Sequence, residues 1–127
     1  MRNFAFAGAL FSGLGVMFGA FGAHVLKQSL SADNLQVFIT GTNYQILHGL
    51  ALLLLSALEG KLNCSHRATV TGWLFLFGIV FFSGSLYVLS LTGIKAMGMV
   101  APVGGICLIA GWLMLAIYIW QAKKSEI

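Results

Sequence analysis

The sequence predicts an all-α integral membrane protein, with four transmembrane helices in an antiparallel bundle and a short amphipathic outer segment between helices 1 and 2. Two observations lead to this fold class. First, 59% of the 127 residues are hydrophobic and only 8% are charged, which is typical of polytopic membrane proteins rather than of soluble domains. Second, the charged residues gather at five places, and each of the uncharged stretches between them is long enough to cross a bilayer core as a helix of about 20 residues.

These uncharged stretches set the bounds of the elements. The helices are predicted near residues 4–26, 41–58, 68–91 and 99–120. Ser31 suits the N-cap of a helix, and apolar residues at helical spacing make an amphipathic segment near residues 31–40, before helix 2 or continuous with it. Gly93 suits the C′ position after helix 3. The chain is therefore expected to form a single membrane domain over residues 1–127.

The basic residues predict the orientation of the bundle. Those at the termini and in the loop between helices 2 and 3 fall on one side of the membrane, namely Arg2, Lys61, Arg67, Lys123 and Lys124. Only Lys27 and Lys95 fall on the other side. Because loops rich in Lys and Arg stay in the cytoplasm, both termini are expected there. The net charge of +4 fits this orientation and contact with membrane lipid, and it gives no reason to expect a nucleic-acid partner.

Small residues indicate where helices pack closely. Gly15, Gly19 and Ala23 recur at every fourth position of helix 1 and would let another helix approach its backbone. This ridge either packs the bundle or forms the contact of a homo-oligomer, and the first interpretation is favoured. A second group, at the start of helix 4, predicts a thin and kinked first turn. It consists of Pro102, Gly104 and Gly105.

Polar side chains on three helices fall at a similar depth, in the outer half of the bundle when the helical rise of about 1.5 Å per residue is counted. Those of helix 2 share one face, and on helix 3 Ser85 is expected to bond back to its own helix. We predict that these side chains converge in a candidate polar site between the helices. Its members are His24, Tyr44, Gln45, His48, Ser83, Ser85 and Tyr87.

Several motifs in combination resemble a known family. They are Gly19-Ala20-Phe21-Gly22-Ala23-His24, Thr40-Gly41 followed by Tyr44-Gln45 and His48, Phe82-Ser83-Gly84-Ser85-Leu86-Tyr87 with Leu91-Thr92-Gly93, and Pro102 with Gly104-Gly105. With them the chain resembles, over nearly its whole length, the domain of unknown function 423 family. This is the YgdD/YwdK-like group of small bacterial inner-membrane proteins, similar to the eukaryotic transmembrane protein 256 type. The resemblance implies a four-helix protein of the bacterial inner membrane with no established activity.

Three classes of function compete, namely a structural role, binding or transport, and metal binding or catalysis. The favoured one is an accessory or structural membrane protein, in a homo-oligomer or a larger membrane complex, whose polar cluster is an interhelical hydrogen-bond network. The alternative is binding or transport of a small molecule, ion or lipid from the outer side. No Asp or Glu lies within a predicted helix, and the cytoplasmic half offers no polar path, which counts against ion-coupled transport.

Catalysis and metal binding are disfavoured by the residues available. His24 and His48 could supply two ligands to a metal or haem, but a zinc site needs three or four protein ligands. The sequence has no Ser/His/Asp set within reach of one site and no glycine-rich phosphate loop. We therefore expect no enzyme activity, no cofactor and no metal.

Overall fold

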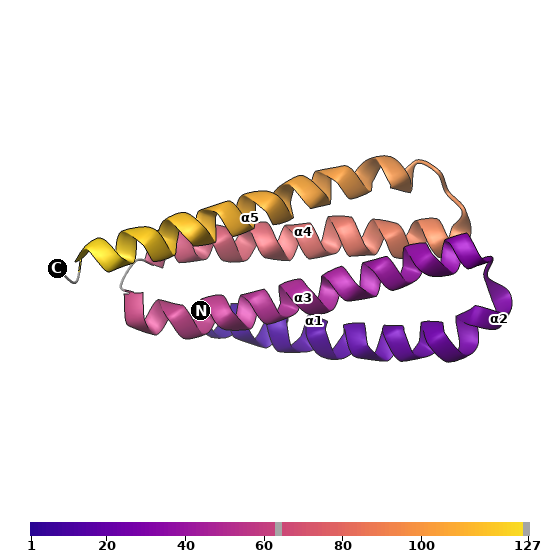
Figure 1. The fold of residues 1–127 in the computed structure, drawn as a ribbon, viewed down its shortest axis with the longest axis horizontal. Coiled ribbons are helices and arrows are strands. Elements are labelled where there is room, and N and C mark those ends of the chain that lie inside the picture. The colour runs from indigo at the N-terminus through magenta and orange to yellow at the C-terminus, as the bar shows by residue number, and fades with distance from the viewer. Residues whose placement is uncertain (63–64, 126–127) are drawn as a thin grey trace.

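The protein is a bundle of long antiparallel helices in the computed structural model, which describes residues 1–62 and 65–125 (Figure 1). The elements are α1 (Arg2–Phe21), a π-helical turn η1 (Gly22–Leu26), α2 (Lys27–Ser29), α3 (Ala32–Leu62), α4 (Ser65–Thr92) and α5 (Met97–Ser125). The described residues contain no strand. Four helical stretches are long and apolar enough to cross a membrane, so the predicted fold class is confirmed. They are Arg2–Ser29, Ala32–Leu62, His66–Thr92 and Met97–Ala122.

Local sequence sets the helix ends. The Ser31 hydroxyl accepts a hydrogen bond from the Asn34 backbone nitrogen at 3.2 Å, and α3 begins at the next residue. The amphipathic segment at residues 31–40 therefore continues directly into the second membrane span. At the end of α4, Gly93 has a φ of 71° and donates its N–H to the Leu89 carbonyl at 2.9 Å. This left-handed conformation suits glycine and stops the helix.

Each long helix packs mainly on its neighbours in sequence. Helix α3 contacts both α1 and α4, and α4 also packs extensively on α5. Figure 1 shows both chain termini at one end of the bundle, with the α1–α3 and α4–α5 connections at the opposite end. Helices α3 and α4 are therefore the central pair, and polar side chains on them can reach the rest of the bundle.

Glycines allow two backbone-to-backbone crossings. A Cβ atom on Gly8 would lie only 2.5 Å from the carbonyl oxygen of Gly49, so α1 and α3 touch there. A Cβ on Gly104 would overlap the backbone nitrogen of Phe82, so α4 and α5 touch as well. Gly104, for which close packing is predicted, lies at this crossing. Pro102 lies exposed within α5, and Gly105 is half-buried.

The predicted ridge on α1 does not stay on one interface. Gly15 is buried, and a Cβ there would lie 2.6 Å from the Ile46 side chain of α3. Gly19 is half-buried and Ala23 is exposed. Spacing explains the difference, because each step of four residues turns a helix about 40° past a full circle, whereas seven residues fall about 20° short of two turns. The face of this segment that contacts α3 instead follows Gly8, Gly15 and Gly22, all of which are buried.

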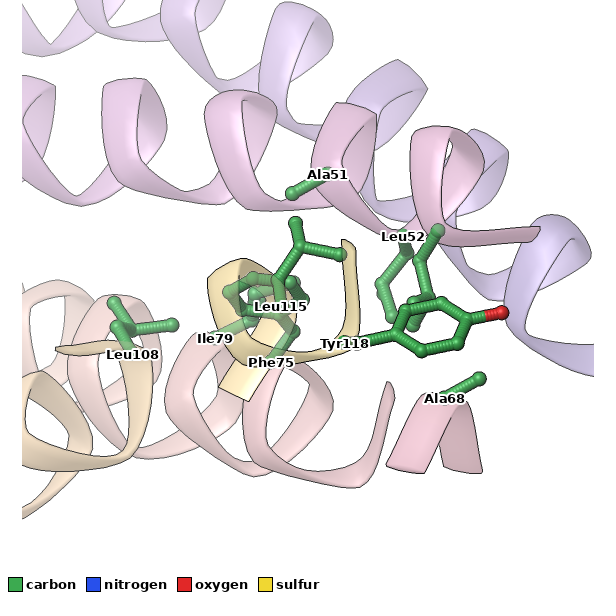
Figure 2. Close-up of a cluster of buried hydrophobic side chains, with 9 residues drawn as sticks. Ala51, Leu52, Ala68, Phe75, Ile79, Leu108, Leu115 and Tyr118 are labelled. Atoms are coloured by element: carbon green, nitrogen blue, oxygen red, sulfur yellow. The ribbon is translucent and has the colours of Figure 1, made fainter. Parts of the chain in front are cut away.

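Hydrophobic side chains of α3, α4 and α5 form the core. Figure 2 shows the ring of Tyr118 between Leu52 of α3 and Ala68 of α4. Leu52, Phe75 and Tyr118 have no exposed surface. The buried cluster consists of Ala51, Leu52, Leu55, Ala68, Phe75, Ile79, Leu108, Leu115 and Tyr118. It extends from the middle of the bundle toward the end that carries the termini, and the rings of His48 and Trp112 lie against its Phe75, with centroids 5.8 and 5.2 Å away.

Candidate functional site

The side chain of Gln45 links three helices. It is buried in α3 with 3% of its surface exposed. Its Nε2 donates to the backbone oxygen of Phe11 in α1 at 2.8 Å, and its Oε1 accepts a hydrogen bond from the Tyr87 hydroxyl of α4 at 2.6 Å. The donor and acceptor ends of one amide are thus used by two different helices. A buried amide with both ends bonded avoids the cost of an unsatisfied polar group.

His48 links α3 to the fourth helix. Its Nε2 lies 3.0 Å from Nε1 of Trp112 in α5, and its Nδ1 lies 2.7 Å from the Tyr44 backbone oxygen. Because indole N–H is only a donor, Nε2 must accept; the carbonyl is only an acceptor, so Nδ1 must carry the proton. The partners therefore assign a neutral imidazole with the proton on Nδ1. Both ring nitrogens are occupied within the bundle.

Ser83 adds a contact between the central helices. Its hydroxyl donates to the Gly41 backbone oxygen at 2.7 Å across the α3–α4 interface. Gly41 permits this approach, because a Cβ there would lie 2.9 Å from the ring of Tyr87. That ring also makes an edge contact with Phe18 of α1, with centroids 5.5 Å apart. The region around Gln45 and Tyr87 is therefore a junction of α1, α3 and α4.

Three of the predicted members take other roles. The Ser85 hydroxyl bonds to the Phe82 carbonyl of its own helix at 2.9 Å, as the sequence indicated. Tyr44 contributes its backbone oxygen and its ring, which stacks on His48 at 5.8 Å, but the residue is 42% exposed. His24 is exposed on the π-helical turn and does not join the cluster. It lies nine residues after Gly15, which is about half a turn away from the face that packs on α3.

Comparison with known proteins places this bundle in a family. Residues 18–105 match the family described as "Protein of unknown function (DUF423)". The chain belongs to this family. Similar proteins include a UPF0382 membrane protein of Staphylococcus saprophyticus, 49% identical over 92% of this chain and 96% of its own length, and the UPF0382 membrane protein YwdK of Bacillus subtilis, 42% identical over 92% and 95%. No solved structure matches significantly.

In this DUF423 protein the polar cluster includes one residue that the sequence pattern did not indicate. Trp112 supplies the hydrogen bond that joins α5 to His48, and its ring also packs edge-on against Phe75 at 5.2 Å. Membrane tryptophans usually occupy the two interfaces, where the indole N–H meets water. Trp112 instead lies near the middle of α5 (Met97–Ser125). Its depth was a signal that the indole needs a partner inside the bundle.

The geometry of this DUF423 protein bears on metal binding. Among the described residues, no group of three His, Cys, Asp or Glu side chains lies close enough to hold a metal ion. His24 and His48 do not converge, because one is exposed and the other is buried. A metal on His48 would also displace either the Trp112 N–H or the proton on Nδ1. In this arrangement the chemistry of His48 is hydrogen bonding between helices.

Proposed function

We propose that this protein is an accessory or structural membrane protein without catalytic activity, whose polar cluster fixes the geometry of the four helices. The cluster consists of Gln45, His48, Ser83, Tyr87 and Trp112. The observation that carries the proposal is the use of both amide ends of Gln45 and both ring nitrogens of His48 by other protein groups. A site that binds a ligand or carries ions would keep some polar groups directed into a cavity.

The energies fit a positioning role. Hydrogen bonds between membrane helices contribute about 0.6 kcal/mol each on average. Within the polar cluster four of them join helices, from Gln45 to Phe11, Tyr87 to Gln45, Ser83 to Gly41 and Trp112 to His48. Their sum, roughly 2 kcal/mol, is modest beside the packing of the core. Their direction, however, fixes which faces of α1, α4 and α5 meet α3, and this would present a defined surface to partners.

Replacing His48 separates the structural role from ligand binding. We expect His48→Gln and Trp112→Phe both to lower the melting temperature of the purified protein, since Trp112→Phe removes the donor of the Trp112–His48 bond and His48→Gln removes its imidazole acceptor. Intact-mass analysis should find no small molecule that wild-type retains and the variants lose. A molecule lost from His48→Gln at unchanged melting temperature would favour the alternative function, binding or transport of a small molecule, ion or lipid from the outer side.

We further propose that the protein lies in the bacterial inner membrane with both termini in the cytoplasm. The asymmetry of basic residues supports this orientation. Cysteine labelling tests it, in a background where Cys64 and Cys107 are replaced by serine. In intact cells an impermeant thiol reagent should label Ser31→Cys and spare Ser65→Cys. The opposite pattern would reverse the orientation.

We also propose a homo-oligomer or a larger membrane complex. The first span supports this, because only 11% of the apolar stretch within Arg2–Ser29 is buried in the bundle, compared with 44% within Ala32–Leu62. The Ile46 side chain of α3 already packs against Gly15, so a contact with another chain would use the opposite face of α1. Light scattering in mild detergent should give a mass above that of one chain. A purely monomeric sample that captures no partner would count against the proposal.

A further inference from the structure

The exposed face of α3 carries an amide side chain among apolar ones. Asn43 is exposed, and within the described part of the chain its side chain makes no hydrogen bond. Leu47, one turn further along the same face, is exposed as well. An asparagine amide has two N–H donors and one oxygen acceptor, and lipid tails can satisfy none of them. Asn43 therefore lacks a partner that neither its own chain nor lipid supplies.

Asn43 lies well below the end of the bundle. Its neighbour Thr42 is level with Gly19 of α1, since a Cβ on Gly19 would lie 3.8 Å from the Thr42 hydroxyl. The first lysine beyond Gly19 is Lys27, and eight residues of helix rise roughly 12 Å. One leaflet contributes about 15 Å to the hydrocarbon core of a bilayer. The Asn43 amide is therefore placed in the hydrocarbon layer, where unpaired polar groups are costly.

Residues on this side of α3 form a continuous seam along the helix. They follow one another at alternate steps of three and four residues, which is the spacing of the contact line in a left-handed coiled coil. The side of the helix that includes Thr42, Gln45 and Gly49 is buried in the bundle. A further helix can therefore lie along the seam without displacing α1 or α4. The α3 seam consists of Thr40, Asn43, Leu47, Leu50, Leu54 and Ala57.

A second copy of this chain supplies the partner that Asn43 lacks. Copies inserted in the same direction have parallel α3 helices, so a two-fold axis along the membrane normal brings each residue of the seam to its equivalent at one depth. Because the amide has both donors and an acceptor, two Asn43 side chains can bond to each other. A single polar residue on such a contact line fixes the register and the number of helices. The chemistry of Asn43 thus favours a copy of itself.

The exposed leucines alone would not select a protein partner. Exposed side chains in the middle of α1 are also apolar, among them Leu10, Val16 and Met17, and lipid tails solvate such groups as well as another helix does. We propose that two copies associate in parallel through the α3 seam, with the two Asn43 amides hydrogen-bonded across the interface. This inference rests on the proposed homo-oligomer and adds a contact on α3 that is separate from the exposed face of α1.

Cysteine cross-linking in isolated membranes tests the seam. The full-length chain, with Cys64 and Cys107 replaced by serine, carries either Leu47→Cys or Leu54→Cys and is treated with an oxidant. We expect a disulfide-linked product of twice the chain mass from both variants. Ile109→Cys is the control, because Ile109 is an exposed apolar residue on α5, and it should give none. Equal cross-linking of Ile109→Cys and Leu47→Cys would show random collision and overturn the proposal.

The same experiment separates this contact from the homo-oligomer itself. Absence of the product from both seam variants would overturn the α3 contact. If Leu10→Cys on α1 then cross-links, the homo-oligomer stands and uses the other face. If light scattering also gives the mass of one chain, the homo-oligomer fails as well. A cross-linked product of a different mass from Leu47→Cys would assign the seam to another protein and overturn the pairing of two copies.

Variants of the amide test the hydrogen bond. Asn43→Leu should raise the dissociation constant of self-association about tenfold, the loss expected for two hydrogen bonds between membrane helices. Asn43→Gln keeps the amide and should retain most of the affinity. Asn3→Leu, the same exchange at an exposed asparagine at the start of α1, should leave the constant unchanged. Sedimentation at several protein-to-detergent ratios measures it, and wild-type affinity in Asn43→Leu would overturn the pairing of the two amides.

Discussion

Gly104→Ala is expected to lower the free energy of unfolding by about 1–3 kcal/mol, the usual range for adding a methyl group to a well-packed interior. The added Cβ would meet the backbone nitrogen and Cα of Phe82. Backbone atoms cannot rotate away as a side chain can, so α4 and α5 would have to separate along their length. Denaturation from mild detergent into sodium dodecyl sulfate, followed by tryptophan fluorescence, measures the change.

Matched glycines provide the control for this substitution. A Cβ on Gly84 of α4, or on Gly13 of α1, would have nothing within 4 Å. Alanine at either position should not destabilise the bundle, and should stabilise it by up to about 1 kcal/mol because alanine favours the helix more than glycine does. Gly8→Ala should behave like Gly104→Ala, because its Cβ would approach the Gly49 carbonyl. If Gly13→Ala and Gly8→Ala destabilise equally, the close crossing of α1 and α3 is not what these glycines provide.

The sequence was sufficient to predict the all-α fold class with four membrane-length helices, and two of the helix ends. Charge is so costly in lipid that the uncharged stretches alone indicate four helices. Ser31 and Gly93 mark helix ends through local chemistry, by a side-chain acceptor and by a left-handed φ, and the structure has both features. These signals lie within a few residues of the feature that they determine. They could therefore be interpreted without knowing how the helices pack.

The composition of the polar cluster depended on information that the sequence pattern lacked. His24 was expected at the depth of the cluster, but it lies nearer the loop end, because Gly22 beside it packs on Phe38, seven residues before Gln45 in α3. Ala23 and His24 are also exposed, away from α3. The buried face of the first span follows Gly8, Gly15 and Gly22, which are seven residues apart. Trp112 was not predicted as a member of the cluster, because an indole in an apolar helix can act simply as a packing side chain. Only the hydrogen bond from its N–H shows its polar role. Which helix supplies that partner is a tertiary property.

Gln45→Leu should destabilise the bundle by about 1–3 kcal/mol, the cost of leaving a buried polar partner unsatisfied. The change removes the bonds to Phe11 and to Tyr87 at once. The backbone oxygen of Phe11 remains within the backbone hydrogen bonding of α1, whereas the Tyr87 hydroxyl loses the acceptor that Gln45 provides. Gln36→Leu is the control, since Gln36 is an exposed glutamine earlier in the same helix. It should leave the unfolding curve almost unchanged.

The double variant gives the sharper result, because it tests the physical reason rather than the size of the loss. Tyr87→Phe removes the hydroxyl that Gln45→Leu leaves without its acceptor, and replacing both partners of a buried bond by apolar groups can be nearly neutral. We therefore expect Gln45→Leu with Tyr87→Phe to be more stable than Gln45→Leu alone, measured by the same denaturation. If the two losses simply add, the 2.6 Å bond between Tyr87 and Gln45 does not couple α4 to α3. The junction would then depend on the packing of the Tyr87 ring against Gly41 and Phe18.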